Sequence, residues 1–244
     1  MINLRSHAIA RLIPADADAL FEPISYAMPP GWRTAHPAPS PLTGWGGRTK
    51  RLLDIVLALL VLPILAAAML VVAVAIRCDS PGPVLFRQER VGLHNRRFAL
   101  LKFRTMYHGA SAEPGCRQAT RHDPRITRVG HFLRCTSLDE LPQVFNVLRG
   151  DMSIVGPRPH APGTRAGGRL FEDVTPRYAD RHMVRPGITG LAQVRGWRGE
   201  TDIEEKLLRR VESDLEYIQT WSLRLDFLIT WRTIFTVLRM RNAY

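Results

Sequence analysis

An apolar segment is the strongest constraint on what this chain can fold into. From Ile55 to Ile76 the sequence contains no charged residue, and its length suffices to cross the hydrocarbon core of a bilayer. A buried helix this long and this apolar is uncommon in a soluble core. The segment therefore predicts a membrane helix, and the rest of the chain must fold around it.

The centre and the flanks of this segment predict how it meets the membrane. Pro63 removes one backbone hydrogen bond and crowds the preceding turn, so a bend is expected there. Arg48 and Arg51 precede the segment, while Arg77 and Arg87 follow it, so the positive-inside rule favours neither crossing direction. A helix that bends at Pro63 and leaves on the same face would satisfy both flanks. The favoured form is re-entrant; a spanning helix stays open, because spanning helices also tolerate proline.

Three regions follow from this assignment. Residues 1–47 are rich in Pro, Ala and Gly without a sustained apolar period, which predicts a disordered leader. Residues 48–78 form the membrane helix, and residues 79–244 form a domain on the cytoplasmic side. Within that domain, Val84–Val91 and Phe98–Phe103 have strand character on either side of a Gly- and Asn-containing turn, which predicts a β-hairpin.

Two amphipathic helices are predicted near the C-terminus. Glu204–Trp221 places leucines and other apolar residues at helical spacing, with charges on the opposite face. The stretch 221–241 mixes aromatic side chains with arginines, a composition typical of helices in a membrane interface. A plain amphipathic helix on the domain core is the equal alternative. The expected fold class is α+β, mostly helical, with one re-entrant membrane helix, a small β-hairpin and interfacial amphipathic helices.

The charge balance points to an anionic partner. Lys and Arg outnumber Asp and Glu by 34 to 22, giving a formal net charge of +12. Anionic lipid and a phosphorylated substrate both fit, whereas the arginines form no recognised nucleic-acid-binding motif, so nucleic acid is not predicted. The cysteines Cys78, Cys116 and Cys135 have neither zinc-ligand spacing nor an even count, so they are expected to be reduced thiols without a role.

Asp139 and Glu140, in the stretch TSLDELPQVFN, are the first candidates for chemistry. Ser137 followed three residues later by Glu140 fits a capping box, so the pair has a purely structural explanation. A helix start also presents free N–H groups and partial positive charge to a phosphate. One carboxylate could then attack while its neighbour holds a cation, and the residues alone leave both alternatives open.

Basic side chains in turn-rich motifs surround this pair in the sequence. They are Lys102 and Arg104 in LKFRTM, Arg134 in FLRCTSLDE, Arg158 in GPRPH and Arg185 in RPGITG. Prolines on both sides of Arg158 restrict its backbone, and the glycines near Arg185 would let a ligand approach the main chain. Basic loops, a carboxylate pair and a membrane segment together suggest phosphoryl chemistry at a membrane surface. Mg²⁺ is the expected cation, since it binds through one or two carboxylates plus substrate phosphates.

From about Thr49 to Tyr244 the chain resembles the bacterial sugar transferases, the monotopic polyprenyl-phosphate phosphoglycosyl transferases. The matching stretches occur in the family's order: KRLLDIVLALL, DSPGPVLFRQERVG, KFRTM, TRVGHFLRCTSLDELPQVFNVLRGDMSIVGPRP, VRPGITGLAQVRG, DLEYIQTWSLRLDF and the terminal NAY. One departure is Leu62, which stands before Pro63 where the family often has Ser. A hydroxyl that could satisfy freed backbone is therefore absent at the expected bend.

The resemblance implies transfer of a sugar 1-phosphate from a UDP-sugar to undecaprenyl phosphate, with release of UMP. It implies that Asp139 is the nucleophile, that Glu140 is the Mg²⁺ ligand, and that Arg134 and Arg158 hold phosphates. Lys102, Arg104 and Arg185 lie in matched motifs as further phosphate-binding candidates. Direct attack by the lipid phosphate, with both carboxylates binding only metal, stays open.

The resemblance also implies a location and partners. The expected setting is the bacterial inner membrane, with the domain on the cytoplasmic face and in contact with anionic lipid. UDP-glucose is the first choice of donor and UDP-galactose the second, and assembly into a homo-oligomer is left open. A membrane-tethered scaffold or regulator of polysaccharide export is the alternative function. No contacts are assigned within the Gly- and Arg-rich segment 161–181.

Overall fold

The computed structural model describes residues 40–110, 123–197, 199, 201 and 203–238. Most of the predicted leader, residues 1–39, lies outside the described residues, as does the terminal NAY motif. The elements follow along the chain as α2 (Trp45–Asp79), β1 (Leu85–Val91), η2 (Leu93–Asn95), β2 (Arg97–Phe103), α3 (Arg128–Thr136), η3 (Leu138–Glu140), α4 (Gln143–Arg149), β3 (Ser153–Val155), β4 (Arg165–Ala166), β5 (Arg169–Leu170), α5 (Phe171–Val174), η4 (Tyr178–Met183), β6 (Gly187–Thr189), α6 (Leu191–Val194), α7 (Glu204–Thr220) and α8 (Leu223–Leu238).

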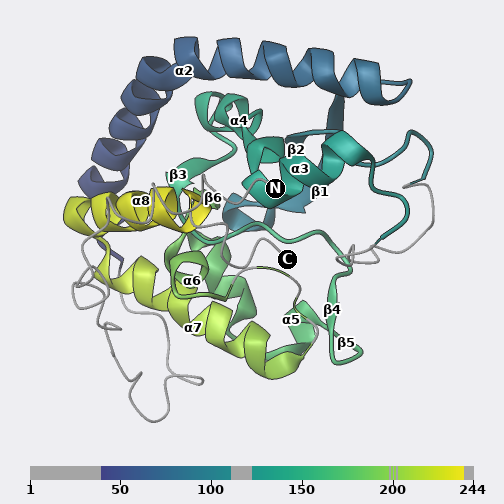
Figure 1. Cartoon of the computed structure of the whole chain (residues 1–244). Helices are drawn as coiled ribbons and strands as arrows, with labels where there is room; N and C mark the ends of the chain where they lie inside the picture. The colour runs from purple at the N-terminus through teal and green to yellow at the C-terminus, as the bar shows by residue number, and fades with distance from the viewer. Residues whose placement is uncertain (1–39, 111–122, 198, 200, 202, 239–244) are drawn as a thin grey trace, which may run out of the picture. The chain divides into compact units, whose positions relative to one another are not determined.

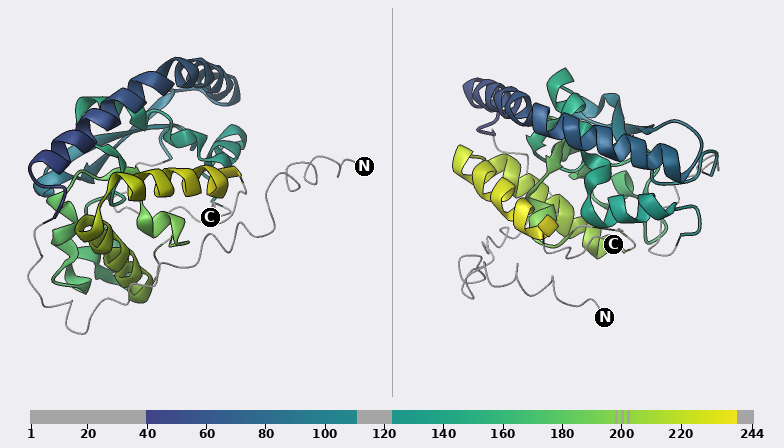
Figure 2. Two further views of the ribbon diagram at one scale, coloured as in Figure 1. Left: turned by 90° about the vertical axis from the view of Figure 1, so that its left-hand side faces the viewer. Right: turned by 45° about the horizontal axis from the view of Figure 1, so that its top comes forward.

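The apolar segment forms one long helix, α2, which begins at Trp45 and continues through Pro63 to Asp79. Figure 1 shows its two arms meeting at an angle, and the further views show the same bent course (Figure 2). Pro63 is the one proline inside this helix, and a proline that removes a backbone bond is the ordinary cause of such a bend. Among the described residues, α2 alone is long and apolar enough to cross a membrane.

One face of α2 packs on the domain and the other is exposed. Ala58 on the first arm joins a core cluster with Val144 and Val147 of α4, and Val72 on the second arm joins another with Leu133 of α3. On the opposite face, large apolar side chains such as Ile64, Leu70 and Val71 are exposed. A contiguous apolar surface of this kind is typical of contact with a membrane.

The predicted hairpin is confirmed. β1 and β2 pair antiparallel, with Leu85 opposite Phe103 and Val91 opposite Arg97. The turn between them contains His94 and Asn95 in left-handed backbone conformations. This ribbon supplies Lys102 to the region described below, near the end of β2.

The predicted C-terminal helices are present as α7 and α8. In α7, the apolar positions Leu207, Val211 and Leu215 are buried, as helical periodicity indicates. In α8, Ile229 is buried whereas Phe227 and Trp231 are exposed. One face of α8 therefore packs on the domain core, and its other face exposes aromatic side chains. Together these elements confirm the α+β, mostly helical fold class.

A buried ion pair joins the segment after β5 to α7. The Nη2 atom of Arg181 lies 2.5 Å from Oδ2 of Asp214, and the two side chains are only 2% and 3% exposed. Arg181 also donates to the backbone oxygen of Arg158 at 2.8 Å. Removing one member of such a pair leaves an uncompensated buried charge.

We therefore expect Asp214→Asn to lower the free energy of unfolding by about 3 kcal/mol. Glu205→Gln on the same helix is the matched control, because its side chain is 74% exposed and lies 3.9 Å from Arg209; its effect should stay within about 0.5 kcal/mol. Denaturant unfolding of the full chain in detergent measures both. Equal effects of the two substitutions would contradict the assignment.

Candidate active site

Asp139 and Glu140 lie in the short turn η3, directly after α3. The backbone changes direction at Ser137, whose left-handed conformation has φ 61°, so the pair turns back toward the domain. Both residues are buried, with exposed fractions of 8% and 9%. Ser137 makes no side-chain capping hydrogen bond to η3. The serine side chain therefore does not form the capping box that the sequence offered as an alternative role for Ser137 and Glu140.

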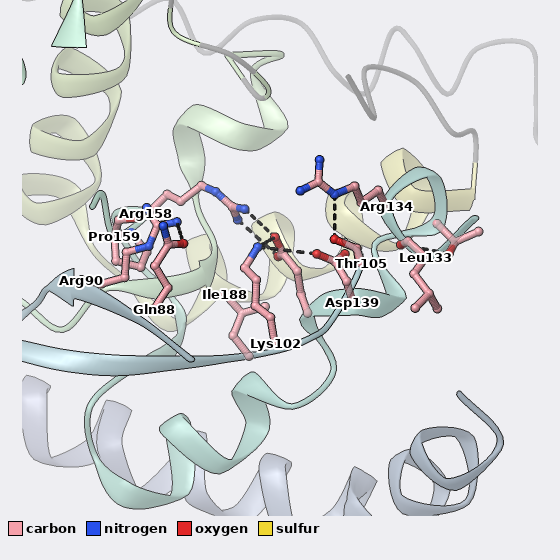
Figure 3. Close-up of polar contacts among 12 residues, drawn as sticks. Gln88, Arg90, Lys102, Thr105, Leu133, Arg134, Asp139, Arg158, Pro159 and Ile188 are labelled. Atoms are coloured by element: carbon pink, nitrogen blue, oxygen red, sulfur yellow. Dashed lines mark hydrogen bonds and ion pairs between the residues drawn. The ribbon is translucent and has the colours of Figure 1, made fainter. Parts of the chain in front are cut away.

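Two cations converge on these carboxylates. Lys102 Nζ lies 3.1 Å from Oε1 of Glu140 and 3.6 Å from Oδ2 of Asp139. Arg158 donates from Nη1 to Oε2 of Glu140 at 3.2 Å and from Nη2 to Oε1. Figure 3 shows Lys102 and Arg158 directed toward this region from different parts of the chain. Glu140 is thus bound by a bidentate arginine and a lysine, an arrangement that holds its carboxylate in one orientation.

Asn146 of α4 positions Lys102. Its Oδ1 accepts from the N–H of Leu101 at 2.9 Å, and its Nδ2 donates to the carbonyl of Ala99 at 2.8 Å. The side-chain amide of Asn146 on α4 therefore makes hydrogen bonds to the backbone of β2 that a neighbouring strand would otherwise make. Asn146 is fully buried, and sequence reasoning missed it because an isolated Asn in a helical stretch gives no signal of a tertiary partner.

Arg134 is positioned by a close approach between α3 and the end of β2. A Cβ on Gly130 would lie 2.0 Å from the backbone oxygen of Thr105, so only glycine lets the helix come this near. Arg134 lies one turn further along α3, and its Nε donates to Oγ1 of Thr105 at 2.9 Å. The predicted phosphate-binding residue Arg134 therefore lies beside the carboxylate pair, as Figure 3 shows.

The GPRP and RPGITG motifs meet through a short parallel strand pair. β3 and β6 pair with Ser153 opposite Gly187, and a Cβ on Gly187 would lie 2.1 Å from the backbone nitrogen of Gly156. Protein backbone, rather than a ligand, fills the space that these glycines provide. This packing fixes the start of the segment that carries Arg158.

Two of the predicted phosphate-binding residues, Arg104 and Arg185, contact backbone oxygens. Arg104 donates to the backbone oxygens of Pro81 and Ser80 at 2.5 and 2.7 Å, closing the turn after α2. Arg185 donates from Nε to the backbone oxygen of Gly150 at 2.9 Å. The structure therefore brings Lys102, Arg134 and Arg158 to the carboxylate pair, and it shows no contact of Arg104 or Arg185 with that pair.

The environment of Asp139 disfavours its negative charge. Burial raises its pKa above the ordinary value of 3.8, and Glu140 raises it further, while Lys102, Arg134 and Arg158 act in the opposite direction. A carboxylate whose charge is less stabilised is a more basic one, and basicity favours nucleophilic attack. Three cations next to two carboxylates also leave an excess of positive charge that can receive an anionic ligand.

The carboxylate pair is the candidate magnesium site, and an ion bound there would share Glu140 with Arg158 and Lys102, which contact both of its oxygens. The carboxyl groups of Asp139 and Glu140 are adjacent oxygen donors, and the described part of the chain contains no group of three or more metal-ligating side chains. Mg²⁺ commonly takes one or two protein carboxylates and completes its shell with water and substrate phosphates. A carboxylate pair beside basic side chains therefore offers the kind of oxygen ligands that this ion prefers.

An exposed apolar helix and a buried carboxylate pair surrounded by cations are the combination expected of a membrane-associated protein that acts on an anionic ligand. The family follows from comparison with known proteins. The chain belongs to the bacterial sugar transferase family, whose model matches residues 45–240. The resemblance given by the sequence motifs is confirmed.

Three relatives show how much of the chain is shared. An "Undecaprenyl-phosphate glucose phosphotransferase" of Komagataeibacter xylinus is 52% identical over 84% of this chain and 38% of the relative. A "UDP-glucose:undecaprenyl-phosphate glucose-1-phosphate transferase" of Caulobacter vibrioides is 51% identical over 80% of this chain and 72% of the relative. The "Exopolysaccharide production protein PSS" of Rhizobium leguminosarum bv. phaseoli is 49% identical over 80% of this chain and 98% of the relative. The chain thus spans well under half of the first relative and nearly all of the third.

Asp139→Asn is expected to raise the free energy of unfolding at pH 7 by about 1 kcal/mol. The folded pKa of this carboxyl is raised above 3.8, so the native protein loses stability as the pH increases from the unfolded pKa through the folded one. The gain from Asn should therefore be small at pH 4 and larger at pH 7. Denaturant unfolding at both pH values measures it, with Asp173→Asn, an exposed carboxylate, as control. A loss of stability, or a gain of equal size at both pH values, would contradict this account.

Proposed function

We propose that this protein transfers glucose 1-phosphate from UDP-glucose to undecaprenyl phosphate and releases UMP, as a step in polysaccharide assembly. The observation that carries the proposal is the buried Asp139 and Glu140 pair with Lys102, Arg158 and Arg134 around it. Family membership supports the reaction class. The names of the relatives at 51% and 52% identity support glucose as the sugar, with galactose as the second choice.

Asp139 acts as the nucleophile in this proposal. Its carboxylate attacks the phosphorus nearer the sugar; an O–P bond forms, and the bond from that phosphorus to the bridging oxygen breaks, so that UMP departs with the electron pair. An oxygen of undecaprenyl phosphate then attacks the same phosphorus, and the bond to Asp139 breaks. The carboxylate is regenerated, and the sugar phosphate is carried on a lipid diphosphate.

The surrounding cations make an attack of one anion on another feasible. A carboxylate is a weak nucleophile toward a negatively charged diphosphate unless positive charge offsets the repulsion and aligns the reacting atoms. Arg158 and Lys102 hold Glu140 beside the attacking group, and Arg134 extends the positive surface. Mg²⁺, held by Glu140 with Asp139 nearby, would supply further positive charge to the phosphates when bound.

We also propose that α2 is re-entrant, with the domain on the cytoplasmic face of the inner membrane. The first arm is tied to the domain by Lys50, whose Nζ lies 2.6 Å from Oδ2 of Asp226 in α8. The second arm ends at Asp79, whose carboxylate accepts from the N–H of Val129 in α3 at 3.2 Å. Contacts of both ends with one domain support a helix that enters and leaves on one side. The exposed aromatic face of α8 would lie in the interface of the same leaflet.

Asp139→Asn is expected to reduce Mg²⁺-dependent UMP release at least ~10³-fold, because an amide cannot replace the attacking carboxylate. Release is measured with detergent-solubilised protein, UDP-glucose and undecaprenyl phosphate, and Asp173→Asn serves as the control that should keep full activity. Addition of EDTA should stop release. UMP release that persists in Asp139→Asn would refute the nucleophile, and no release from the unmodified protein with any UDP-sugar would favour the scaffold alternative.

The covalent step has its own test. With UDP-glucose labelled in the sugar and no lipid acceptor, the unmodified protein should release up to one equivalent of UMP and retain the label on the chain. Direct attack by the lipid phosphate would give neither product under these conditions. Glu140→Gln is expected to lower both the UMP released and the label retained, because the metal ligand is lost. Asp139→Asn should abolish the label.

The topology of α2 is tested by cysteine labelling. Cys78 is naturally exposed at one end, and Thr49, exposed at the other end, can be replaced by Cys in a chain whose other cysteines are Ser. A membrane-impermeant maleimide should label both positions in inside-out vesicles and neither in right-side-out vesicles, because both ends of a re-entrant helix face the cytoplasm. Labelling from opposite sides would overturn the re-entrant form.

A further inference from the structure

Glu140 is bound by basic side chains at both of its carboxylate oxygens. Oε1 accepts from Nζ of Lys102 at 3.1 Å and also from Nη2 of Arg158, while Oε2 accepts from Nη1 of Arg158 at 3.2 Å. A carboxylate oxygen has two lone pairs for hydrogen bonds or metal bonds. The two contacts at Oε1 therefore occupy that oxygen, and a metal ion can bind to it only if one of the two basic side chains moves away.

Arg158 is the side chain that is free to move. Its side chain is 30% exposed, whereas that of Glu140 is 10% exposed. Among the described residues, the guanidinium of Arg158 makes hydrogen bonds only to Glu140. The backbone of Arg158 is fixed, because its oxygen accepts from Arg181 at 2.8 Å. A change in the contact with Glu140 therefore requires only a rotation of the arginine side chain.

Lys102 is held more firmly than Arg158. Its Nζ lies 3.6 Å from Oδ2 of Asp139 in addition to its contact with Glu140. Its side chain is also less exposed than that of Arg158, and Asn146 fixes the strand that carries it. Of the two contacts at Oε1, the one made by Arg158 is therefore the one that a ligand can replace.

A diphosphate offers the guanidinium of Arg158 an equivalent pair of acceptors. Arginine binds carboxylates and phosphates alike through two parallel N–H···O bonds. Arg158 can therefore exchange the two oxygens of Glu140 for two phosphate oxygens and remain paired. Glu140 then keeps Lys102 and gains lone pairs for a metal ion. Mg²⁺ matches this arrangement, since it binds carboxylate and phosphate oxygens at the same time.

We infer that Arg158 couples nucleotide binding to metal binding. Its guanidinium passes from Glu140 to the diphosphate of the nucleotide sugar, and the carboxylate of Glu140 becomes available to Mg²⁺ as a result. The inference rests on the proposed function, because it requires a donor with a diphosphate at this site. Nucleotide and metal then bind with positive coupling, and each strengthens binding of the other by the same factor.

The first test measures metal binding without nucleotide, where the contact with Arg158 opposes it. Mn²⁺, which prefers the same oxygen ligands as Mg²⁺, is titrated into the full chain in detergent and followed by electron paramagnetic resonance. Arg158→Lys keeps the positive charge but cannot bind both oxygens of Glu140. We expect about tenfold tighter Mn²⁺ binding, the effect of one lost charge-assisted hydrogen bond.

Two controls assign this gain to Glu140. Arg185→Lys makes the same substitution at an arginine that donates to the backbone oxygen of Gly150, and it should leave Mn²⁺ binding unchanged. In a protein that carries Glu140→Gln, Arg158→Lys should also have no effect, because the carboxylate for which arginine and metal compete is absent.

The second test measures the coupling itself. An analogue of UDP-glucose with a methylene group in place of the bridging oxygen of the diphosphate binds without turnover, because the P–C bond is not cleaved. Calorimetry with the unmodified protein should show at least ~10-fold tighter binding of this analogue in saturating Mg²⁺ than in EDTA, within the range of ordinary coupling energies. The ratio should fall in Arg158→Lys.

Several results would overturn the inference. They are unchanged or weaker Mn²⁺ binding in a folded Arg158→Lys protein, and a gain that persists in the presence of Glu140→Gln. If Arg158→Lys does not fold, the unmodified protein decides: tighter analogue binding with Mg²⁺ supports the coupling, and equal binding overturns it. UMP release from the unmodified protein judges the proposed function separately. A protein that releases UMP while Arg158→Lys leaves Mn²⁺ binding unchanged would keep the function and lose the coupling.

Discussion

The burial of two neighbouring carboxylates is the constraint on which the rest of the domain depends. An ionised carboxylate away from water is strongly unfavourable unless it is paired and hydrogen-bonded. Asp139 and Glu140 are adjacent in sequence, so neither can move away from the charge of the other. Lys102 from β2 and Arg158 from the segment after β3 contact them, with Arg134 of α3 close by. This one cluster of charges therefore fixes the positions of the hairpin, α3 and the parallel strand pair relative to one another.

The packing of α2 on α3 and α4 links this cluster of charges to the long apolar helix. α2 contributes to both hydrophobic clusters, through Ala58 beside α4 and through Val72 beside α3. α4 carries Asn146, which fixes β2 next to Lys102, and α3 leads directly into Asp139. A shift of either arm of α2 would therefore be transmitted to the elements that hold the carboxylates. Under the proposed function, a lipid-linked acceptor in the membrane would meet a site whose orientation is set by α2.

Sequence reasoning succeeded where a pattern is local. The apolar run of α2, the alternation in the hairpin and the helical period of α7 are each contained in one stretch, so the fold class could be predicted. The cluster of Asp139 with cations was predicted from motif density, but Arg104 and Arg185 were indistinguishable from Arg158 on that basis. An arginine in a turn-rich motif can bind a phosphate or a backbone carbonyl, and only the tertiary position decides. Asn146 and Asp214 were missed for the same reason, because their partners lie far away in the sequence.

The segment from Arg158 to Ala161 joins the carboxylate pair to a second buried ion pair. The guanidinium of Arg158 binds Glu140, and the backbone oxygen of Arg158 accepts from Arg181. Arg181 in turn pairs with Asp214 of α7, and both of these side chains are buried. The oxygen of His160, two residues after Arg158, accepts from the N–H of Val91 in β1. The position of Arg158 beside Glu140 therefore depends on contacts with α7 and with the hairpin, so a change that breaks the Arg181 and Asp214 pair is expected to disturb the carboxylate pair as well.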